Sequence, residues 1–198
     1  MKYPSTIQNL IECFKKYPGV GSKTAERYAL STLDLDQEVI DQFIQSLIDS
    51  KGKIKHCSIC NNWAEDDLCD ICKDKNRDSN LLCVVEDPKS VMLLEKLGIF
   101  NGYYYVIKGL ISPLEGINPE DIELDKLVDR VKNNDIKEVI LAVKPSIEGE
   151  TTSLYISKLL KDTDVIVSKI AHGVPIGTEI DYVDSLTLEL ALENRKEI

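Results

Sequence analysis

Four cysteines in two closely spaced pairs are the residues whose types and spacing most clearly specify a chemistry. Two residues separate the cysteines within each pair, and eight residues separate the pairs, which are Cys57 with Cys60 and Cys69 with Cys72. Two such pairs can surround a zinc ion with four thiolates at Zn–S distances of about 2.3 Å. Because four protein ligands leave no open position on the metal, the pattern predicts one structural Zn²⁺ per chain and not a catalytic one.

Two other chemistries compete for these cysteines. A redox dithiol usually opens a helix of a βαβ unit, and disulfides are uncommon in a reducing compartment. The stretch around the cysteines, about residues 53–78, has little apolar material and cannot bury a core of its own. Zinc binding can supply about 10–16 kcal/mol of folding free energy, so it meets that need. His56 beside the first ligand is interpreted as a surface residue or as one that supports a ligand.

A second segment that could do chemistry runs from Pro18 to Arg27. Gly19 and Gly21 allow a tight turn and a close approach of the backbone to a ligand. The amides that open the following helix would attract an anion. Lys23 and Arg27 are four residues apart, so they share one helical face. The segment could bind a run of phosphate groups, and the same pattern equally fits a turn between two helices with two solvated cations and no ligand.

The same segment resembles the helix-hairpin-helix DNA-binding motif. The usual form of that motif is Pro-Gly-Ile/Val-Gly, two residues, then a small residue and a basic one, and all of these are present after Tyr17. The resemblance implies that Gly19, Gly21, Lys23 and Arg27 contact DNA. A device of this kind holds the sugar–phosphate backbone and does not read base edges.

Carboxylates follow two of the expected strands. Glu86 ends the apolar run 81–85, at a position where α/β folds usually place ligands. Glu148 and Glu150 follow a later strand. Together these features resemble the Toprim fold of topoisomerases, primases and some nucleases. Catalytic members of that fold hold magnesium with a glutamate after the first strand and an Asp-x-Asp pair after a later one.

The Asp-x-Asp pair is replaced in this sequence. Lys144 and Ser146 stand at its two positions. Mg²⁺ requires hard oxygen ligands and is repelled by an adjacent ammonium group, so two-metal phosphoryl chemistry is not expected. Glu86, Glu148 and Glu150 are therefore interpreted as a solvated or partner-facing acidic patch and as candidate partner-binding residues.

The elements that must position these residues change in type along the chain. Apolar residues at helical spacing predict helices from about residue 5 to the glycines, from 22 to 30 and from 36 to about 49, with Ser5 or Thr6 and Ser22 as N-caps. Further on, short apolar runs predict strands at 81–85, 103–107, 138–143 and 164–167, alternating with helices at 90–97, 124–132 and 151–160. This βαβ alternation predicts a mostly parallel sheet with helices on both faces. Cys13 and Cys83 fall on apolar stretches and are expected to be buried.

A mixed α/β protein of four regions is therefore expected. Residues 1–52 form a helix-hairpin-helix DNA-binding region, 53–79 a small four-cysteine zinc finger, 80–167 a Toprim-like domain, and 168–198 a C-terminal interaction segment with a helix from Asp184. No apolar run is long enough to span a membrane. No leader-like segment precedes Thr6, so the chain is expected to stay in the compartment of its synthesis.

The charge of the chain is unevenly distributed. The net charge of −10 counts against nucleic acid as a partner. Residues 1–30, however, carry five basic and two acidic side chains, whereas residues 81–198 carry 13 basic and 21 acidic ones. The N-terminal end can therefore meet a polyanion although the whole chain is acidic.

The order of hairpin, four cysteines, Toprim-like unit and glycine-containing tail is similar to that of the RecR family of bacterial recombination mediators. The tail is residues 170–177, and three further segments match that family in near-identical form: residues 83–86, 112–117 and 145–150. Two residues depart from it, because Lys144 replaces a more usual uncharged polar residue and Ser22 a frequent proline. His172 in the tail is interpreted as a turn or interface residue and not as a catalyst.

The resemblance implies a cytoplasmic, nucleoid-associated bacterial protein of DNA recombination and repair that is not an enzyme. RecR proteins bind DNA, single- or double-stranded, join RecO or RecF, and help to load RecA recombinase onto single-stranded gaps. They form rings or clamps, expected here as a homotetramer, which would gather several copies of Lys23 and Arg27 around one channel. Two alternatives stay open: a Mg²⁺-dependent Toprim nuclease or primase that uses Glu86, Glu148 and Glu150, and a zinc-stabilised adaptor that touches only proteins.

Overall fold

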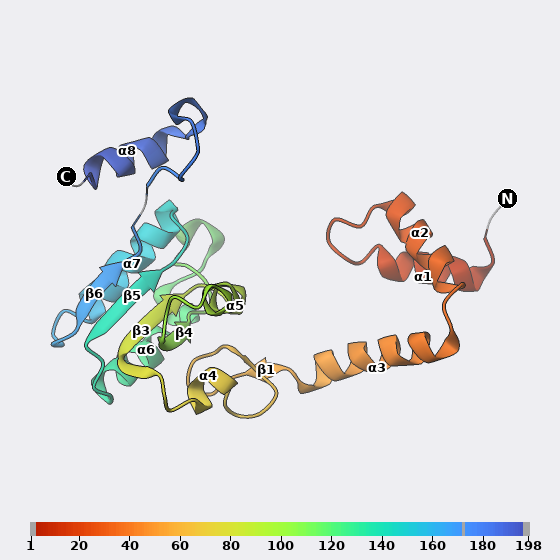
Figure 1. The fold of residues 1–198 in the computed structure, drawn as a ribbon, viewed down its shortest axis with the longest axis horizontal. Helices are drawn as coiled ribbons and strands as arrows, with labels where there is room; N and C mark the ends of the chain where they lie inside the picture. The colour runs from red at the N-terminus through yellow and green to blue at the C-terminus, as the bar shows by residue number, and fades with distance from the viewer. Residues whose placement is uncertain (1–2, 172, 196–198) are drawn as a thin grey trace. The chain divides into compact units, whose positions relative to one another are not determined.

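A computed structural model describes residues 3–171 and 173–195 of the chain (Figure 1). The chain divides into two compact units, residues 1–54 and 55–198, and each is described by itself. His172, which the sequence places in a turn or an interface, lies outside the described residues.

The first unit consists of three helices: α1 (Ser5–Phe14), α2 (Ser22–Thr32) and α3 (Gln37–Lys53). Helices α1 and α2 pack around a small core of Ile11, Ala25 and Ala29. The expected side-chain caps are wrong, because Pro4 and Gly21 occupy the two N-cap positions and neither helix has a side-chain cap. The serines and threonine proposed as caps already lie within the first helical turn.

Helix α3 has the predicted apolar stripe, but no residue of α3 is buried. Five of its apolar side chains are about half exposed, from 45% for Leu47 to 58% for Ile48. A cavity of about 320 Å³ that opens between α1 and α3 is lined by Phe14 and Phe43 among other apolar residues. Cys13 also lines this cavity and is exposed, so the expectation that it is buried is wrong. The first unit therefore presents an apolar face that its own described residues do not cover.

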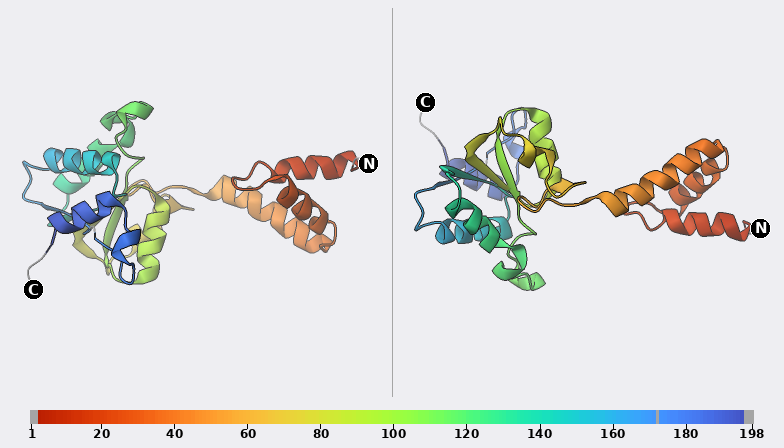
Figure 2. Two further views of the ribbon diagram at one scale, coloured as in Figure 1. Left: turned by 90° about the horizontal axis from the view of Figure 1, so that it is seen from above. Right: turned by 90° about the horizontal axis from the view of Figure 1, so that it is seen from below.

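The second unit is built on a four-stranded sheet in the order β4-β3-β5-β6, with every strand parallel to its neighbours. The strands are β3 (Asp78–Val85), β4 (Gly102–Val106), β5 (Glu138–Ala142) and β6 (Ile166–Lys169). Helix α5 (Pro88–Leu97) lies on one face, and α6 (Leu124–Lys132) and α7 (Ile147–Leu159) lie on the other (Figure 2). The predicted parallel sheet with helices on both faces is confirmed.

The end of strand β3 is a continuous apolar run because both of its faces are buried. Leu82 and Val84 point into the core shared with α6 and α7. Cys83 and Val85 point into a second core shared with α5. A strand that is buried on both faces has no polar alternation. Burial raises the pKa of the Cys83 thiol to about 12, which fits its predicted role as a small buried residue.

The finger precedes the sheet in the same unit. It consists of β1 (Lys55–His56), β2 (Trp63–Ala64), which pair antiparallel, and the short helix α4 (Asp70–Lys73). Its cysteines belong to the same buried cluster as Val85, Val91 and Tyr104. The finger therefore completes the core on the α5 face of the sheet instead of forming a separate one.

The connections and the tail contain shorter elements. Two 3₁₀ turns, η1 (Pro113–Glu115) and η2 (Pro119–Ile122), precede α6. The tail contains η3 (Ile180–Tyr182) and α8 (Ser185–Glu193), which Asp184 caps by accepting from the Thr187 amide at 2.9 Å. Within the described part of the chain, no helix has the length and apolar character needed to cross a membrane.

Strand β4 ends the sheet on one side, and side chains cover its outer edge. Three of its carbonyl oxygens accept hydrogen bonds from side chains that come from three different segments. These bonds join Arg77 to Gly102, Arg130 to Tyr104 and Asn61 to Val106, at 2.9, 2.7 and 3.0 Å. The Val106 amide donates to the Cys60 carbonyl at 2.8 Å. Three outward carbonyls and one outward amide of β4 are thus satisfied without a further strand.

Gly149, in the first turn of α7, leads to a testable prediction. A Cβ atom added there would lie 1.9 Å from the Lys144 carbonyl oxygen. Overpacking of this kind typically costs about 1–3 kcal/mol, so Gly149→Ala should lower the free energy of unfolding by that amount. Gly173→Ala is the matched control, since nothing lies within 4 Å of its added Cβ. Urea denaturation followed by circular dichroism would contradict the prediction if both variants were equally stable.

Candidate metal centre and nucleic-acid interface

The four cysteines of the finger converge on one point. Their sulfur atoms all lie within 4.8 Å of one another, and those of Cys60 and Cys69 are 3.5 Å apart. A tetrahedral zinc ion with Zn–S bonds of about 2.3 Å separates its ligand sulfurs by about 3.8 Å. All four are free thiols, which removes the disulfide interpretation. The spacing therefore fits a zinc site.

The local fold holds each pair of cysteines in place. In the first pair, the Cys57 amide donates to the Asn62 carbonyl at 2.7 Å, and the Asn61 amide donates to the Cys57 carbonyl at 3.0 Å. The Asn62 amide also donates to the Cys60 sulfur. The second pair lies on α4, where Cys69 is the N-cap. Because α4 is a four-residue turn outside any βαβ unit, the redox interpretation has no support.

The charge state of the cluster also fits a bound cation. Hydrogen bonding with Cys69 raises the pKa of Cys60, and the same interaction lowers the pKa of Cys69. Four thiolates cannot all ionise at this distance without a compensating positive charge. A donor set made only of thiolates suits Zn²⁺, which supplies two positive charges at its centre. The cluster therefore fits one structural zinc per chain, which would contribute folding free energy and has no open coordination position.

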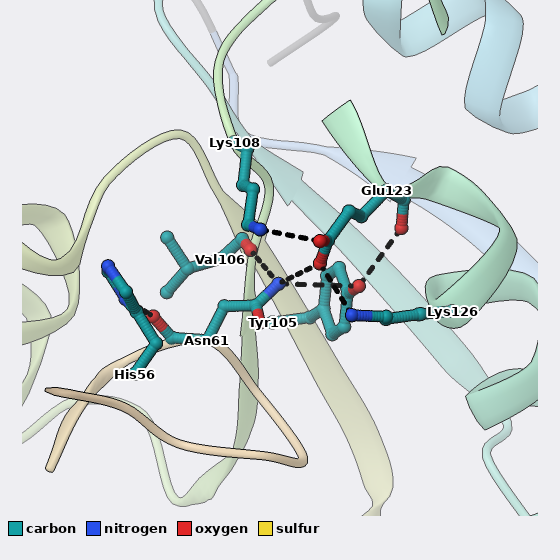
Figure 3. A network of polar contacts seen from close by, with 7 residues as sticks. All are labelled: His56, Asn61, Tyr105, Val106, Lys108, Glu123 and Lys126. Carbon is teal, nitrogen blue, oxygen red and sulfur yellow. Dashed lines mark hydrogen bonds and ion pairs between the residues drawn. The ribbon is translucent and has the colours of Figure 1, made fainter. Parts of the chain in front are cut away.

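Asn61, directly after the first cysteine pair, connects the finger to the sheet (Figure 3). Its backbone is left-handed, with a φ of +60°, a region that Asn tolerates better than most residues. Its side-chain amide donates to the Val106 carbonyl at 3.0 Å and to the Glu123 carboxylate at 3.4 Å. Its own carbonyl lies 2.7 Å from His56 Nδ1. Sequence reasoning missed Asn61, and its only signal was an Asn where a tight turn follows Cys-x-x-Cys.

Glu123 receives this connection on the sheet side. It is the N-cap of α6 and has a φ of +56°. Its carbonyl accepts from the Tyr105 hydroxyl at 3.0 Å, and its carboxylate accepts from Lys126 at 3.0 Å and from Lys108 (Figure 3). The hydrogen bond from Lys108, followed by that from Lys126, lowers the pKa of Glu123. The carboxylate therefore stays ionised at neutral pH and accepts from the Asn61 amide.

Substitutions at Asn61 should separate its side chain from its backbone. Asn61→Gly keeps the left-handed turn but removes the amide, so it should lower the free energy of unfolding by about 1–2 kcal/mol. Asn61→Ala also strains the backbone and should cost about 1 kcal/mol more. Urea denaturation followed by the fluorescence of Trp63, the single tryptophan, measures both. A glycine variant as stable as the parent would show that the amide contributes nothing.

The hairpin of the first unit leaves its helix N-terminus open. Gly19 has a φ of +79°, which makes the turn, and Gly21 is the N-cap of α2. Because Gly21 has no side chain, no side-chain cap occupies the first amides of α2. Lys23 in the first turn of α2 and Arg27 one turn later are exposed, and the Arg27 guanidinium lies 5.6 Å from the Tyr28 ring centroid. Amides and cations together can hold a phosphate group.

The acidic residues at the carboxyl ends of the strands are dispersed. Glu86 Oε2 accepts from the Lys144 amide at 3.4 Å. Glu150 forms an ion pair with Lys169 at 2.8 Å. A hydrogen bond from its own backbone amide lowers the pKa of Glu148. Of the described residues, only the four cysteines form a group of three or more His, Cys, Asp or Glu side chains that could hold a metal. The three glutamates do not form such a group.

Four family models match consecutive parts of the chain. The helix-hairpin-helix model of RecR matches residues 7–51, and the model of the RecR four-cysteine zinc finger domain matches residues 54–74. A Toprim domain model matches residues 80–171, and the RecR C-terminal model matches residues 173–196. The four matches occur in order along the chain and leave only short gaps.

Proposed function

The chain belongs to the RecR family, and from this membership we propose that it is a DNA-binding recombination mediator without catalytic activity of its own. The family domains support a role in recombination and repair. We propose that the protein acts in the bacterial cytoplasm at the nucleoid, with RecO or RecF, to help load RecA onto single-stranded gaps. The proposed division is 1–52 for DNA, 53–79 for zinc, 80–167 for the Toprim-like domain and 168–198 for interaction.

The single observation that carries the proposal is the uncapped start of α2 behind a glycine turn. Gly19 and Gly21 bring the backbone close to a ligand, and the free amides of α2 point toward it. Lys23 and Arg27 add two exposed positive charges on the same side of the helix. This combination binds one phosphate run of single- or double-stranded DNA without reading its sequence.

Self-association reconciles DNA binding with a net charge of −10. The exposed apolar side chains of α3 and the cavity beside them need a cover, and a second copy of the chain can supply it. We propose a ring or clamp, a tetramer, whose symmetry gathers the α2 cations of several copies around DNA. Glu86, Glu148 and Glu150 would then face outward as a patch for basic repair partners.

Binding to labelled single-stranded and gapped DNA over a salt series tests this function. The affinity is expected to fall steeply as salt rises, because cations that neutralise phosphates release counterions. Light scattering should give a mass above that of the 22.3 kDa monomer. A protein that stays monomeric and does not bind DNA even at low salt would overturn the proposal.

An active Toprim enzyme is the second candidate, and Glu86 tests it. Glu86 occupies the strand end at which catalytic relatives hold magnesium. Here its carboxylate accepts a hydrogen bond from the Lys144 amide. The proposed function predicts no Mg²⁺-dependent turnover of DNA or nucleotides, and unchanged DNA affinity in Glu86→Gln. Turnover that the parent shows and Glu86→Gln abolishes would favour the enzyme instead.

A further inference from the structure

A cavity of about 410 Å³ opens between the finger and the sheet, and its described lining includes none of the residues assigned to DNA. Its walls come from the finger, β3, β4, and α6 with the segment that follows it. They include Ile59, Leu81, Tyr103, Arg130, Asn134 and Ile136. Such a volume falls in the range of pockets that hold a ligand or a few side chains.

Arg130 is the cationic group of this cavity, which the zinc ligand Cys72 also lines. It is the only Lys, Arg, Asp or Glu among the described residues that line it. Its Nη1 donates to the Tyr104 carbonyl at 2.7 Å, and its guanidinium lies 6.0 Å from the Tyr103 ring centroid. Asn134 also donates to the Arg130 carbonyl at 2.7 Å. The contacts with Tyr104 and Tyr103 orient the guanidinium before any ligand arrives, and the contact from Asn134 holds the backbone of Arg130.

A fixed guanidinium of this kind suits a carboxylate. Arginine has five N–H donors, and the bond to the edge of β4 uses one of them, so others remain for a ligand. A planar guanidinium can hold both oxygens of a carboxylate. In the segment that carries Arg130, residues 129–137, three basic side chains stand against two acidic ones, whereas this half of the chain as a whole is acidic.

The apolar walls decide between a carboxylate ligand and nucleic acid. A phosphate backbone needs a row of cations along its path, and among the described residues only one cation lines this cavity. Ile59, Leu81 and Ile136 instead provide contact area for an apolar side chain. The ligand that satisfies both parts of the cavity has a carboxylate next to an apolar group.

We propose that this cavity is a docking site for a protein segment that presents an apolar side chain beside a carboxylate. The carboxylate pairs with Arg130, and the apolar side chain packs between Ile59 and Ile136. Peptide segments that combine an acidic group with an aromatic or branched aliphatic residue are the class of partner that this site fits. The inference does not depend on DNA binding at α2.

The test uses the zinc-loaded full chain and N-acetyl-L-phenylalanine, followed by NMR titration, with the neutral N-acetyl-L-phenylalanine amide as the matched probe. The carboxylate should bind at least about fivefold more tightly than the amide. Two variants of the exposed Asn134 change the local charge and keep the Arg130 side chain; both replace the amide that donates to the Arg130 carbonyl, so they are compared with each other. Asn134→Lys should bind the carboxylate about tenfold more tightly than Asn134→Asp does. Arg130→Gln should lose the preference for the carboxylate.

Three results would overturn the proposal. The first is equal binding of the two probes, and the second is equal binding by the two Asn134 variants. The third is tighter binding of thymidine 5′-monophosphate than of N-acetyl-L-phenylalanine in a competition titration, which would make the cavity a nucleotide site. Zinc content and Trp63 fluorescence confirm that each variant is folded. Loss of DNA binding in the Lys23 and Arg27 variants leaves this test unaffected, so the two proposals fail separately.

Discussion

Removal of zinc from the full chain is expected to unfold the finger and to destabilise the sheet beside it. A structural zinc contributes on the order of 10 kcal/mol, which is comparable with the whole stability of a typical domain. The finger shares a buried cluster with Val85, Val91 and Tyr104, so its loss exposes the part of this face of the sheet that α5 does not cover. The helices of the first unit should keep their structure, because their core is separate.

A chelator titration followed by circular dichroism and Trp63 fluorescence measures this effect. Cys60→Ser should reproduce it without a chelator, since three thiolates hold zinc less well than four. Cys13→Ser is the control, because Cys13 is an exposed thiol in the other unit. A chain that releases its zinc and still unfolds at the same urea concentration would show that the metal does not support the fold.

The double variant Lys23→Ala/Arg27→Ala should lose most of its DNA affinity. Each cation that neutralises a phosphate adds close to one unit to the slope of log affinity against log salt. Two cations per chain, repeated in an oligomer, should therefore cost at least about tenfold in affinity at low salt, and the salt slope should fall by about two per engaged chain. Fluorescence anisotropy with labelled single-stranded DNA measures both quantities.

Lys158→Ala/Lys161→Ala removes the same charge from the other unit and serves as the control. Both lysines are exposed at the end of α7. Their loss should change the affinity by less than about twofold if DNA binds at α2, and by as much as the α2 variant if binding follows net charge alone. The comparison thus separates a local interface from a general electrostatic effect.

The local parts of the fold were predictable from the sequence because they depend on near neighbours. Helix α6 begins and ends at the predicted residues 124 and 132, where an apolar stripe sets its limits. The zinc cluster follows from its spacing alone. Strand β6 begins two residues later than expected, at Ile166, since its short apolar run does not say which residues pair with β5.

The contacts that join the elements were not predictable. Asn61, Arg77 and Arg130 are polar residues in stretches that look exposed, yet each donates to a carbonyl of β4. Their role depends on which strand ends the sheet, and one sequence does not fix strand order. The stripe on α3 was predicted, but its exposure was not, because helical spacing shows an apolar face without showing what covers it.

The side chains that cover β4 make the two borders of the sheet unequal. A foreign strand cannot join β4, because its outward carbonyl groups already have donors, whereas no strand of the described residues flanks β6 on its outer side. Addition of a strand by β-augmentation is therefore possible only at β6. Because β4 cannot accept a strand, copies of the chain cannot join edge to edge into a continuous sheet. A metal-depleted chain would lose the hydrogen bond from Asn61 to the Val106 carbonyl, which would leave part of the β4 edge free to pair with another chain. Zinc supplementation during purification should therefore also limit aggregation.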